Sequence, residues 1–172
     1  GENGYISRFL KNNYNSIYKF TSERLGTINL HNLIKKLKPK YLLIMGGLVA
    51  FNLIKNNKEK AFQINVIDTI KTVDFCKEIN VIPIFISSES VFEGSRGFYS
   101  EDYKPSPIFF YGEMKNTVEM YLKKNLKKYF IVRFSKVYSV TSKDNTLLFS
   151  FLNQENLSKE KMKLSYDSCF SP

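Results

Sequence analysis

Two stretches of the sequence decide the fold: IFISSESVFEG at residues 84–94 and YGEMK at residues 111–115. The first begins as a continuous apolar run and ends in two serine hydroxyls, which is typical of a buried strand that reaches the edge of a sheet. The second begins a predicted helix and places Tyr111 and Lys115 one turn apart on the same face. A hydroxyl, a phenol and an ammonium group close together predict a proton-transfer site for an alcohol or a carbonyl compound, because the ammonium stabilises the phenolate.

The spacing of Tyr111 and Lys115 is weak evidence on its own. The chain has 11 tyrosines in 172 residues, and lysine is its commonest charged residue, so about one such pair is expected by chance. An ordinary helix surface is therefore the alternative interpretation. The context that favours a site is the preceding strand end, with its hydroxyls Ser87 and Ser88.

Length and composition predict one globular domain with a sizeable core, since 43% of the residues are hydrophobic and 15% aromatic. The apolar runs are too short to span a bilayer, and we expect no export signal. Cys76 and Cys169 lie far apart without metal-ligand neighbours, so we expect reduced thiols, a cytoplasmic location and no metal site. The single histidine, His31, argues against a Ser-His-Asp triad.

The net charge of +10 has two interpretations. It suits an anionic partner such as a phosphorylated cofactor or a nucleotide-linked substrate, or it is simply a lysine-rich solvated surface. Arginine, which reads bases and phosphates best, occurs four times. The composition therefore argues against a dedicated nucleic-acid binder.

Strand and helix patterns alternate along the chain. We predict strands at 16–21, 41–45, 81–86 and 129–134, helices beginning at Tyr5 and at 28–37, 58–79 and 109–128, and a short helix at 146–152. Continuous apolar strands indicate a parallel sheet covered on both faces, which is a Rossmann-like, doubly wound α/β fold. Ligands bind such sheets at the carboxyl ends of the strands, where the polar candidates of this chain are expected to gather.

A glycine turn precedes the first predicted helix. Gly1 and Gly4 form the turn, and Tyr5 and Ile6 begin the helix, so that backbone N–H groups can approach a phosphate at its N-terminus. Two glycines at this spacing are also common in ordinary turns. Because a turn of this kind normally follows a strand, we expect a first strand to precede this sequence in the natural protein.

Further candidates follow the predicted strands. Ser22 and Arg24 suit the 2′-phosphate of NADP rather than the ribose of NAD, although an ordinary polar loop is the alternative. Gly46 and Gly47 allow the tight backbone turn that a ligand beside the chain would require. Asn65, within a predicted helix, is either a hydrogen-bonding strut to a neighbouring strand end or a surface residue.

Taken in order, these residues resemble the extended short-chain dehydrogenase/reductase superfamily, and most closely the branch of the dTDP-4-dehydrorhamnose reductases. The matching stretches are Gly1-x-x-Gly4, Lys38–Lys40, Phe62–Val66, Ile86–Gly94, Tyr99-x-Glu101, Pro105-x-Pro107, Tyr111–Lys115 with Glu119, Val132–Ser135 before Val137-Tyr138, and Asp167–Pro172. Each stretch is weak alone, but the ordered set is specific and covers nearly the whole chain.

The resemblance implies hydride transfer between NADP (or NAD) and a 4-keto sugar on a nucleoside diphosphate. It implies that Tyr111 exchanges the proton, that Lys115 binds the nicotinamide ribose and lowers the pKa of the tyrosine, and that Ser88 binds the substrate oxygen. The implied cofactor-binding residues are Gly1, Gly4, Tyr5, Ile6, Ser22, Arg24, Gly46, Gly47, Asn65, Ser87 and Lys115, and the implied substrate-binding residues are Ser88, Glu89, Tyr111 and Ser135. A homodimer is compatible with the resemblance.

The sequence also departs from that branch. Ser88 replaces a more usual threonine, Glu89 and Ser90 replace aspartate and tyrosine, and Met45–Gly47 replaces Asn-Ala-Ala. The resemblance implies that residues 1–138 form the NAD(P)-binding domain without its first strand. It also implies that residues 139–172 begin a substrate-binding region, most of which is absent.

Alternative functions remain open at this point. The same fold accommodates a nucleotide-sugar epimerase or dehydratase, a reductase of small substrates, and a cofactor-binding regulatory subunit that does no chemistry. Val91–Gly94 favours the reductase branch, whereas loss of activity in Tyr111→Phe is needed to exclude the regulatory subunit. A steep salt dependence of DNA or RNA binding would be needed to favour a nucleic-acid binder.

Overall fold

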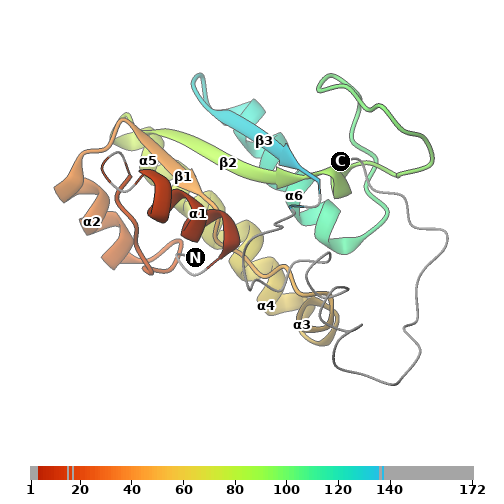
Figure 1. Cartoon of the computed structure of the whole chain (residues 1–172), viewed down its shortest axis with the longest axis horizontal. Coiled ribbons are helices and arrows are strands. Elements are labelled where there is room, and N and C mark those ends of the chain that lie inside the picture. Colours follow the sequence, from red (N-terminus) through yellow and green to blue (C-terminus); the bar gives the residue numbers. More distant parts are fainter. Residues whose placement is uncertain (1–3, 15, 17, 136, 138–172) are drawn as a thin grey trace. The chain divides into compact units, whose positions relative to one another are not determined.

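The computed structural model (Figure 1) describes residues 4–14, 16, 18–135 and 137. The chain divides into two compact units, Gly1–Arg133 and Phe134–Pro172. The elements described below belong to the first unit, except for the last residue of the last strand. The helix predicted at 146–152 and the substrate-binding region predicted at 139–172 lie outside the described residues.

The first unit is an α/β structure. Its elements in chain order are α1 (Tyr5–Tyr14), α2 (Ile28–Leu37), β1 (Tyr41–Ile44), α3 (Phe51–Asn56), α4 (Lys58–Phe62), the π-helix η1 (Gln63–Asp68), α5 (Thr69–Glu78), β2 (Ile82–Ser88), the 3-10 turn η2 (Glu89–Val91), α6 (Phe110–Asn125) and β3 (Phe130–Phe134). The strands form a parallel three-stranded sheet in the order β1-β2-β3 (Figure 1). The predicted Rossmann-like α/β class is confirmed.

The central strand β2 organises the packing. It pairs with β1 in a parallel register that runs from Tyr41 opposite Ile82 to Ile44 opposite Phe85. Helices α5 and α6 pack against β2 and against each other. The buried side chains of this main core are Ile44, Ile54, Ala61, Val66, Val73, Phe85, Met114, Val118 and Leu122. Burial of this apolar surface fixes the position of α6 relative to the end of β2.

Local signals define α2, and the predicted bounds of this helix are confirmed. Thr27 caps its first turn by accepting a hydrogen bond from the backbone N–H of Leu30. At the other end, Lys38 adopts the left-handed conformation with a φ of 46°, and Pro39 follows. The helix buries Leu30 and Ile34 in a second, smaller apolar cluster.

The strand predicted at 16–21 is wrong. Residues 18–24 belong to no strand or helix, although apolar and polar side chains alternate there. A strand is stable only when its backbone groups pair with a neighbouring strand, and none of the described strands pairs with this segment. The segment is instead fixed at its end, where the N–H of Gly26 donates to Thr72 Oγ1 of α5 at 2.8 Å.

The other predicted elements are present with shifted ends. The helix predicted at 58–79 is continuous, but it contains the π-helix η1. Strand β2 ends in Ser87 and Ser88, as expected for the two hydroxyls, and so extends beyond the predicted bounds 81–86, whereas α3 was not predicted. Within the described part of the chain, no helix combines the length and apolar character needed to cross a membrane.

Candidate active site at the ends of the parallel strands

The carboxyl ends of the strands bring several predicted site residues to one edge of the sheet. Gly46 and Gly47 follow β1, and Ser88 ends β2. This follows from the parallel topology, because parallel strands all end on the same side. Ser135, the next residue after β3, belongs to the second unit, so its substrate-binding role stays a prediction. Arg24 was expected at the same edge, but no strand precedes it among the described residues.

Ser88 lies where β2 meets the turn η2. Its Oγ accepts a hydrogen bond from the N–H of Ser90 at 3.2 Å and thereby caps the turn. The hydroxyl also donates to Glu89 Oε2 at 3.1 Å, and its oxygen lies 3.1 Å from Ser90 Oγ. The side chain is 8% exposed. Ser88 is therefore held in place by local contacts and keeps a small opening to solvent.

Gly112 allows α6 to approach this turn. A Cβ atom at position 112 would lie 1.9 Å from the carbonyl oxygen of Ser90 and 3.0 Å from Pro107 Cβ. Only glycine therefore permits the first turn of α6 to pack directly on η2. Sequence reasoning did not single out Gly112, although a glycine inside a helical pattern is a signal for close packing.

Lys115 is buried one turn further along α6. Its Nζ donates to the carbonyl oxygen of Ile86 at 2.7 Å and lies 4.7 Å from the centroid of the Phe85 ring. Burial lowers the pKa of this lysine to about 8, and the negative charge of Glu119 partly opposes that shift. The hydrogen bond to β2 shows how α6 fixes the ammonium beside the strand that carries Ser88.

Tyr111 lies beside the lysine, but its pKa moves in the opposite direction from the one predicted. The ammonium of Lys115 is 5.6 Å from the centroid of the Tyr111 ring. Burial, and then the charge of Glu89, raise the pKa of Tyr111 to about 12. The effect of Lys115 on this pKa that the resemblance implies stays a prediction, and in the structure its ammonium donates to the Ile86 carbonyl. At neutral pH the phenol keeps its proton, which suits it to act as an acid.

Glu119 of α6 and Arg133 of β3 form a largely buried ion pair. Glu119 is 0% exposed, and its carboxylate accepts bonds from Ser87 Oγ at 2.6 Å, from Arg133 Nε at 3.0 Å and from Arg133 Nη2 at 2.6 Å. The hydroxyl hydrogen of Ser87 is thus donated to Glu119, so a contact between Ser87 and a cofactor stays a prediction. Sequence reasoning noted Glu119 and Arg133 only as parts of matching stretches, and an acidic residue one turn after Lys115 was the available signal.

Asn65 proves to be a strut, the first of the two predicted alternatives. Its Oδ1 accepts from the N–H of Leu48 at 2.7 Å, and its Nδ2 donates to the carbonyl oxygen of Leu48 at 2.9 Å. The side chain is buried within η1 and so fixes the loop after β1. π-helical turns are frequent at functional sites.

Packing within the protein requires glycine at position 47 and makes position 46 tight. Gly47 has a φ of 150°, and a Cβ there would lie 2.8 Å from Asn65 Oδ1. A Cβ at Gly46 would lie 3.2 Å from Leu25 Cδ1. The close backbone approach predicted at this turn is present, and its partners are side chains of the protein itself.

The remaining predicted cofactor residues lie near the beginning of the chain. Gly4 is exposed and precedes α1, Tyr5 is the first residue of that helix, and Ile6 is partly buried. Gly1 lies outside the described residues.

Ser22 and Arg24 have exposed side chains in the irregular segment. Thr27 Oγ1 donates to the carbonyl oxygen of Arg24 at 2.7 Å and so fixes its backbone. No contact in the described residues joins these side chains to Lys115, and their cofactor role stays a prediction.

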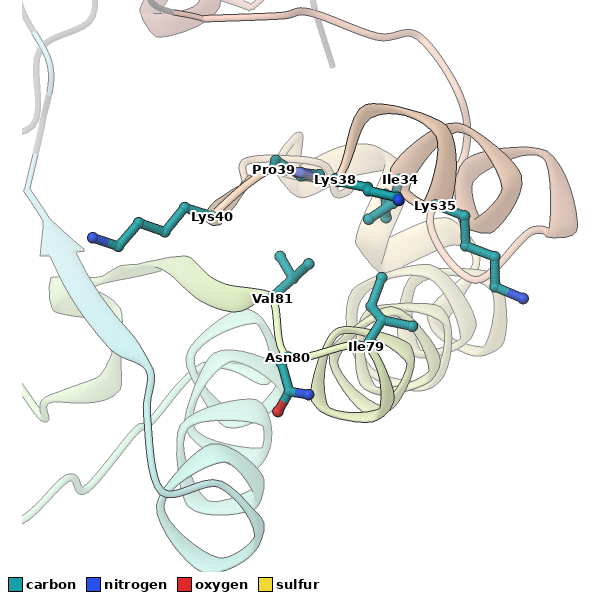
Figure 2. Close-up of a pocket in the computed structure, with 8 residues that line it drawn as sticks. All are labelled: Ile34, Lys35, Lys38, Pro39, Lys40, Ile79, Asn80 and Val81. Carbon is teal, nitrogen blue, oxygen red and sulfur yellow. The ribbon is translucent and has the colours of Figure 1, made fainter.

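The surface hollow in Figure 2 lies at the opposite edge of the sheet, where β1 and β2 begin. It has a volume of about 470 Å³ and is lined by Ile34, Lys35, Lys38, Pro39, Lys40, Ile79, Asn80 and Val81. The ammonium groups of Lys35 and Lys40 point to opposite sides in this view, so they do not converge on one ligand. The predicted residues Ser88, Tyr111 and Lys115 are not among those that line this hollow.

Solved structures of nucleotide-sugar enzymes share the fold. The dTDP-4-dehydrorhamnose reductase from Bacillus anthracis in complex with NADP matches 93% of this chain with 24% identity and a TM-score of 0.81. The orthologue from Clostridium acetobutylicum matches 91% with 19% identity and a TM-score of 0.73. MoeE5 in complex with UDP-glucose and NAD matches 90% with 19% identity and a TM-score of 0.75.

The chain corresponds to part of these proteins, since it spans 59%, 57% and 58% of their respective lengths. It matches none of the curated proteins compared with it. The family described as the RmlD substrate binding domain matches residues 11–172, which is nearly the whole chain. The protein therefore belongs to the RmlD substrate binding domain family.

Proposed function

We propose that the protein reduces a nucleotide-linked 4-keto sugar with NADPH or NADH at a site formed by Ser88, Tyr111 and Lys115. The observation that carries the proposal is the packing of Tyr111 and Lys115 of α6 against the end of β2, the strand that carries the Ser88 hydroxyl. Family membership supports it, as do relatives solved with NADP or with UDP-glucose and NAD.

The protonation states of the site favour reduction. Tyr111 keeps its proton at neutral pH and can donate it to the oxygen of a carbonyl group as that oxygen becomes an alkoxide. Ser88 would hydrogen-bond the same oxygen and orient it. Lys115 would stabilise the phenolate that forms, because its ammonium lies beside the tyrosine ring.

The donor set of the chain fits a nicotinamide dinucleotide, which supplies the hydride when it is bound. The N-terminus of α1 offers backbone N–H groups for the pyrophosphate, and the exposed guanidinium of Arg24 with the Ser22 hydroxyl suits a 2′-phosphate. Lys115 is a buried cation that would bind a ribose hydroxyl. These groups complement a polyanion with sugar hydroxyls.

The first test is calorimetric titration of NADPH and NADH into the full-length protein. We expect binding of NADPH that weakens in Arg24→Ala, about tenfold for loss of one phosphate contact, and stays unchanged in Lys36→Ala, which removes a charge from the exposed face of α2. Absence of binding to either cofactor contradicts the proposal.

Turnover of nucleotide-linked 4-keto sugars then tests the chemistry. Tyr111→Phe removes the proton donor and should lower kcat by about 10²–10⁴-fold while cofactor binding persists. Tyr14→Phe, at an exposed tyrosine of α1, is the matched control. Equal turnover in the two variants would assign the proton transfer to another group.

Two observations favour a second candidate, a cofactor-binding subunit that does no chemistry. The pKa of Tyr111 is raised, and the ammonium of Lys115 is hydrogen-bonded to β2 instead of the phenol. This alternative predicts that the cofactor binds to the same residues but that no 4-keto sugar is reduced. Tyr111→Phe then changes no reaction rate.

A further inference from the structure

A loop at residues 92–109 joins the turn η2 to helix α6 (Figure 1). It leaves the turn at Phe92, whose N–H donates to the carbonyl oxygen of Glu89 at 2.9 Å. It returns to the turn at Ser106, whose N–H donates to the carbonyl oxygen of Val91 at 2.9 Å. The hydroxyl of the proposed site lies directly before η2, and its proton donor lies in the first turn of α6. The loop therefore connects the two parts of that site.

Three aromatic rings pack together within this loop. Phe92 and Tyr99 are stacked, with centroids 4.4 Å apart and an angle of 5° between the ring planes. Tyr103 meets both rings edge-on, with centroid distances of 6.0 Å and 5.0 Å. All three side chains are partly buried. Such ring pairs stabilise a structure beyond the area that they bury, so the loop has a small core of its own.

A charged side chain from β3 contacts this loop. The guanidinium of Arg133 lies 4.9 Å from the centroid of the Phe92 ring, and its Nη1 donates to the carbonyl oxygen of Glu101 at 3.2 Å. Its Nε and Nη2 donate to the carboxylate of Glu119 at 3.0 Å and 2.6 Å. Separate N–H groups thus serve the helix and the loop. A planar group with five fixed donors can bind both in this way, whereas an ammonium group cannot.

The position of the guanidinium is set independently of the loop. Glu119 is 0% exposed, and its carboxylate also accepts a hydrogen bond from Ser87 Oγ of β2 at 2.6 Å. The side chain of Arg133 is 14% exposed. A two-pronged, charge-assisted pair fixes the orientation of both groups. Helix α6 and strand β2 therefore provide a firm support on which the guanidinium can hold the loop.

We propose that Arg133 is a positioning residue that, fixed by Glu119, holds the loop at residues 92–109 closed and so keeps the two parts of the proposed site aligned. The alignment needs such support, because α6 meets η2 at Gly112, where no side chain interlocks the two. The inference rests on the proposed function for its relevance to catalysis. The restraint on the loop itself requires no substrate.

The test is amide hydrogen exchange of the full-length protein, measured by NMR without cofactor or substrate. Arg133→Lys keeps a positive charge beside Glu119 but loses the planar group over the ring and the donor to the loop. We expect exchange at the hydrogen-bonded N–H groups of Phe92, Tyr103 and Ser106 to become about tenfold faster relative to the amides of β2. An equal rise in β2, or no rise in the loop, overturns the inference.

The matched control is Arg96→Lys, the same substitution at an exposed arginine of the same loop. The guanidinium of Arg96 lies 5.3 Å from the centroid of the Tyr103 ring, and an exposed contact of this kind is weak. Exchange should stay within about twofold of the wild-type rates. Equal effects of the two substitutions would mean that Arg133 has no special role in holding the loop.

A second variant keeps the ion pair intact and so separates the loop contact from the stability of the fold. Phe92→Leu removes the ring beneath the guanidinium but leaves Glu119 and Arg133 paired. If Arg133 acts through this ring, adding Arg133→Lys to Phe92→Leu should speed exchange in the loop by at most about threefold further. An undiminished tenfold rise would show that Arg133 acts through the fold as a whole and would overturn the inference.

Turnover then connects the loop to the proposed site. Arg133→Lys should raise the KM for the 4-keto sugar about tenfold, with an unchanged dissociation constant for NADPH, because the loop adjoins Ser88 and not Arg24. A smaller amount of folded protein would lower the apparent kcat and leave this KM unchanged. An unchanged KM therefore overturns the role of Arg133 in the site.

Failure of this inference is distinguishable from failure of the proposed function. Absence of reductase activity in the wild-type protein contradicts the proposed function, but the exchange rates of the loop remain measurable. Conversely, an active enzyme with unchanged exchange in Arg133→Lys would retain the proposed function and reject the positioning role.

Discussion

Charged side chains are buried at one edge of the sheet and exposed at the other. At the carboxyl ends of the strands, Lys115 and Glu119 are buried, and each has a hydrogen-bond partner on β2. At the amino ends, Lys35, Lys38 and Lys40 are exposed around a hollow and do not converge. Chemistry in a protein requires charges that are desolvated and held, because both conditions shift pKa values and fix geometry.

The comparison teaches that a hollow alone is a poor guide to the site. The hollow lies between the ends of α2 and α5, where helix ends and strand starts leave unfilled surface (Figure 2). The other edge has close packing instead, with helix α6 in contact with the turn after β2. The proposed site is therefore supported by groups with defined partners and not by the volume of a hollow.

The largest effect is expected from breaking the close contact at the functional edge. Gly112→Ala places a methyl group 1.9 Å from the carbonyl oxygen of Ser90, so either α6 or η2 must move. We expect a loss of about 3 kcal/mol or more in the free energy of unfolding, measured by urea denaturation.

The control for this variant is Gly97→Ala. No atom lies within 4 Å of a Cβ at position 97, so the free energy of unfolding should change by less than about 0.5 kcal/mol. Equal effects of the two substitutions would show that the contact between α6 and η2 does not stabilise the fold.

The sequence was sufficient where a local signal defines a feature. Thr27 and Pro39 mark the ends of α2, and the predicted bounds 28–37 match the structure. The spacing of Tyr111 and Lys115 correctly predicted a shared helix face, because helix geometry is local. The parallel order of the strands also followed from alternation of helices and apolar runs.

The sequence was insufficient where distant contacts decide the outcome. The pattern at 16–21 suggested a strand, but no described strand pairs with it. The raised pKa of Tyr111 depends on burial and on Glu89, and the need for glycine at position 112 depends on the Ser90 carbonyl. The spacing of residues along the chain does not show how deeply a side chain is buried or which distant segment packs against it.

A smaller, pH-dependent effect would sharpen the contrast between a buried and an exposed lysine. Burial lowers the pKa of Lys115 from 10.5 to about 8, so between these pH values the unfolded chain binds a proton that the folded chain does not. This lysine therefore makes the wild-type protein more stable as pH rises from 8 to 10.5. Lys115→Met lacks that contribution.

The measurement is the free energy of unfolding across this pH range. The stability of Lys115→Met relative to wild type should fall as pH rises, by at most roughly 3 kcal/mol over the window. Lys36→Met, at an exposed position of α2, should follow the wild-type curve. Parallel curves for Lys115→Met and wild type would mean that Lys115 titrates like a solvated lysine.

The smallest effect is expected at the opposite edge. The ammonium groups of Lys35 and Lys40 are 5.5 Å and 5.3 Å from the ring centroids of Phe75 and Tyr41, and exposed contacts of this kind contribute about 0.5–1 kcal/mol each. Lys35→Met with Lys40→Met keeps the apolar stems, so it should cost about 1 kcal/mol in stability and leave NADPH affinity unchanged, measured by calorimetry. Arg24→Ala should give the reverse result, weaker NADPH binding with little change in stability, because its exposed charge is expected at the cofactor. A loss of cofactor affinity in the lysine variant would move the binding site to the hollow and reverse the assignment of the two edges.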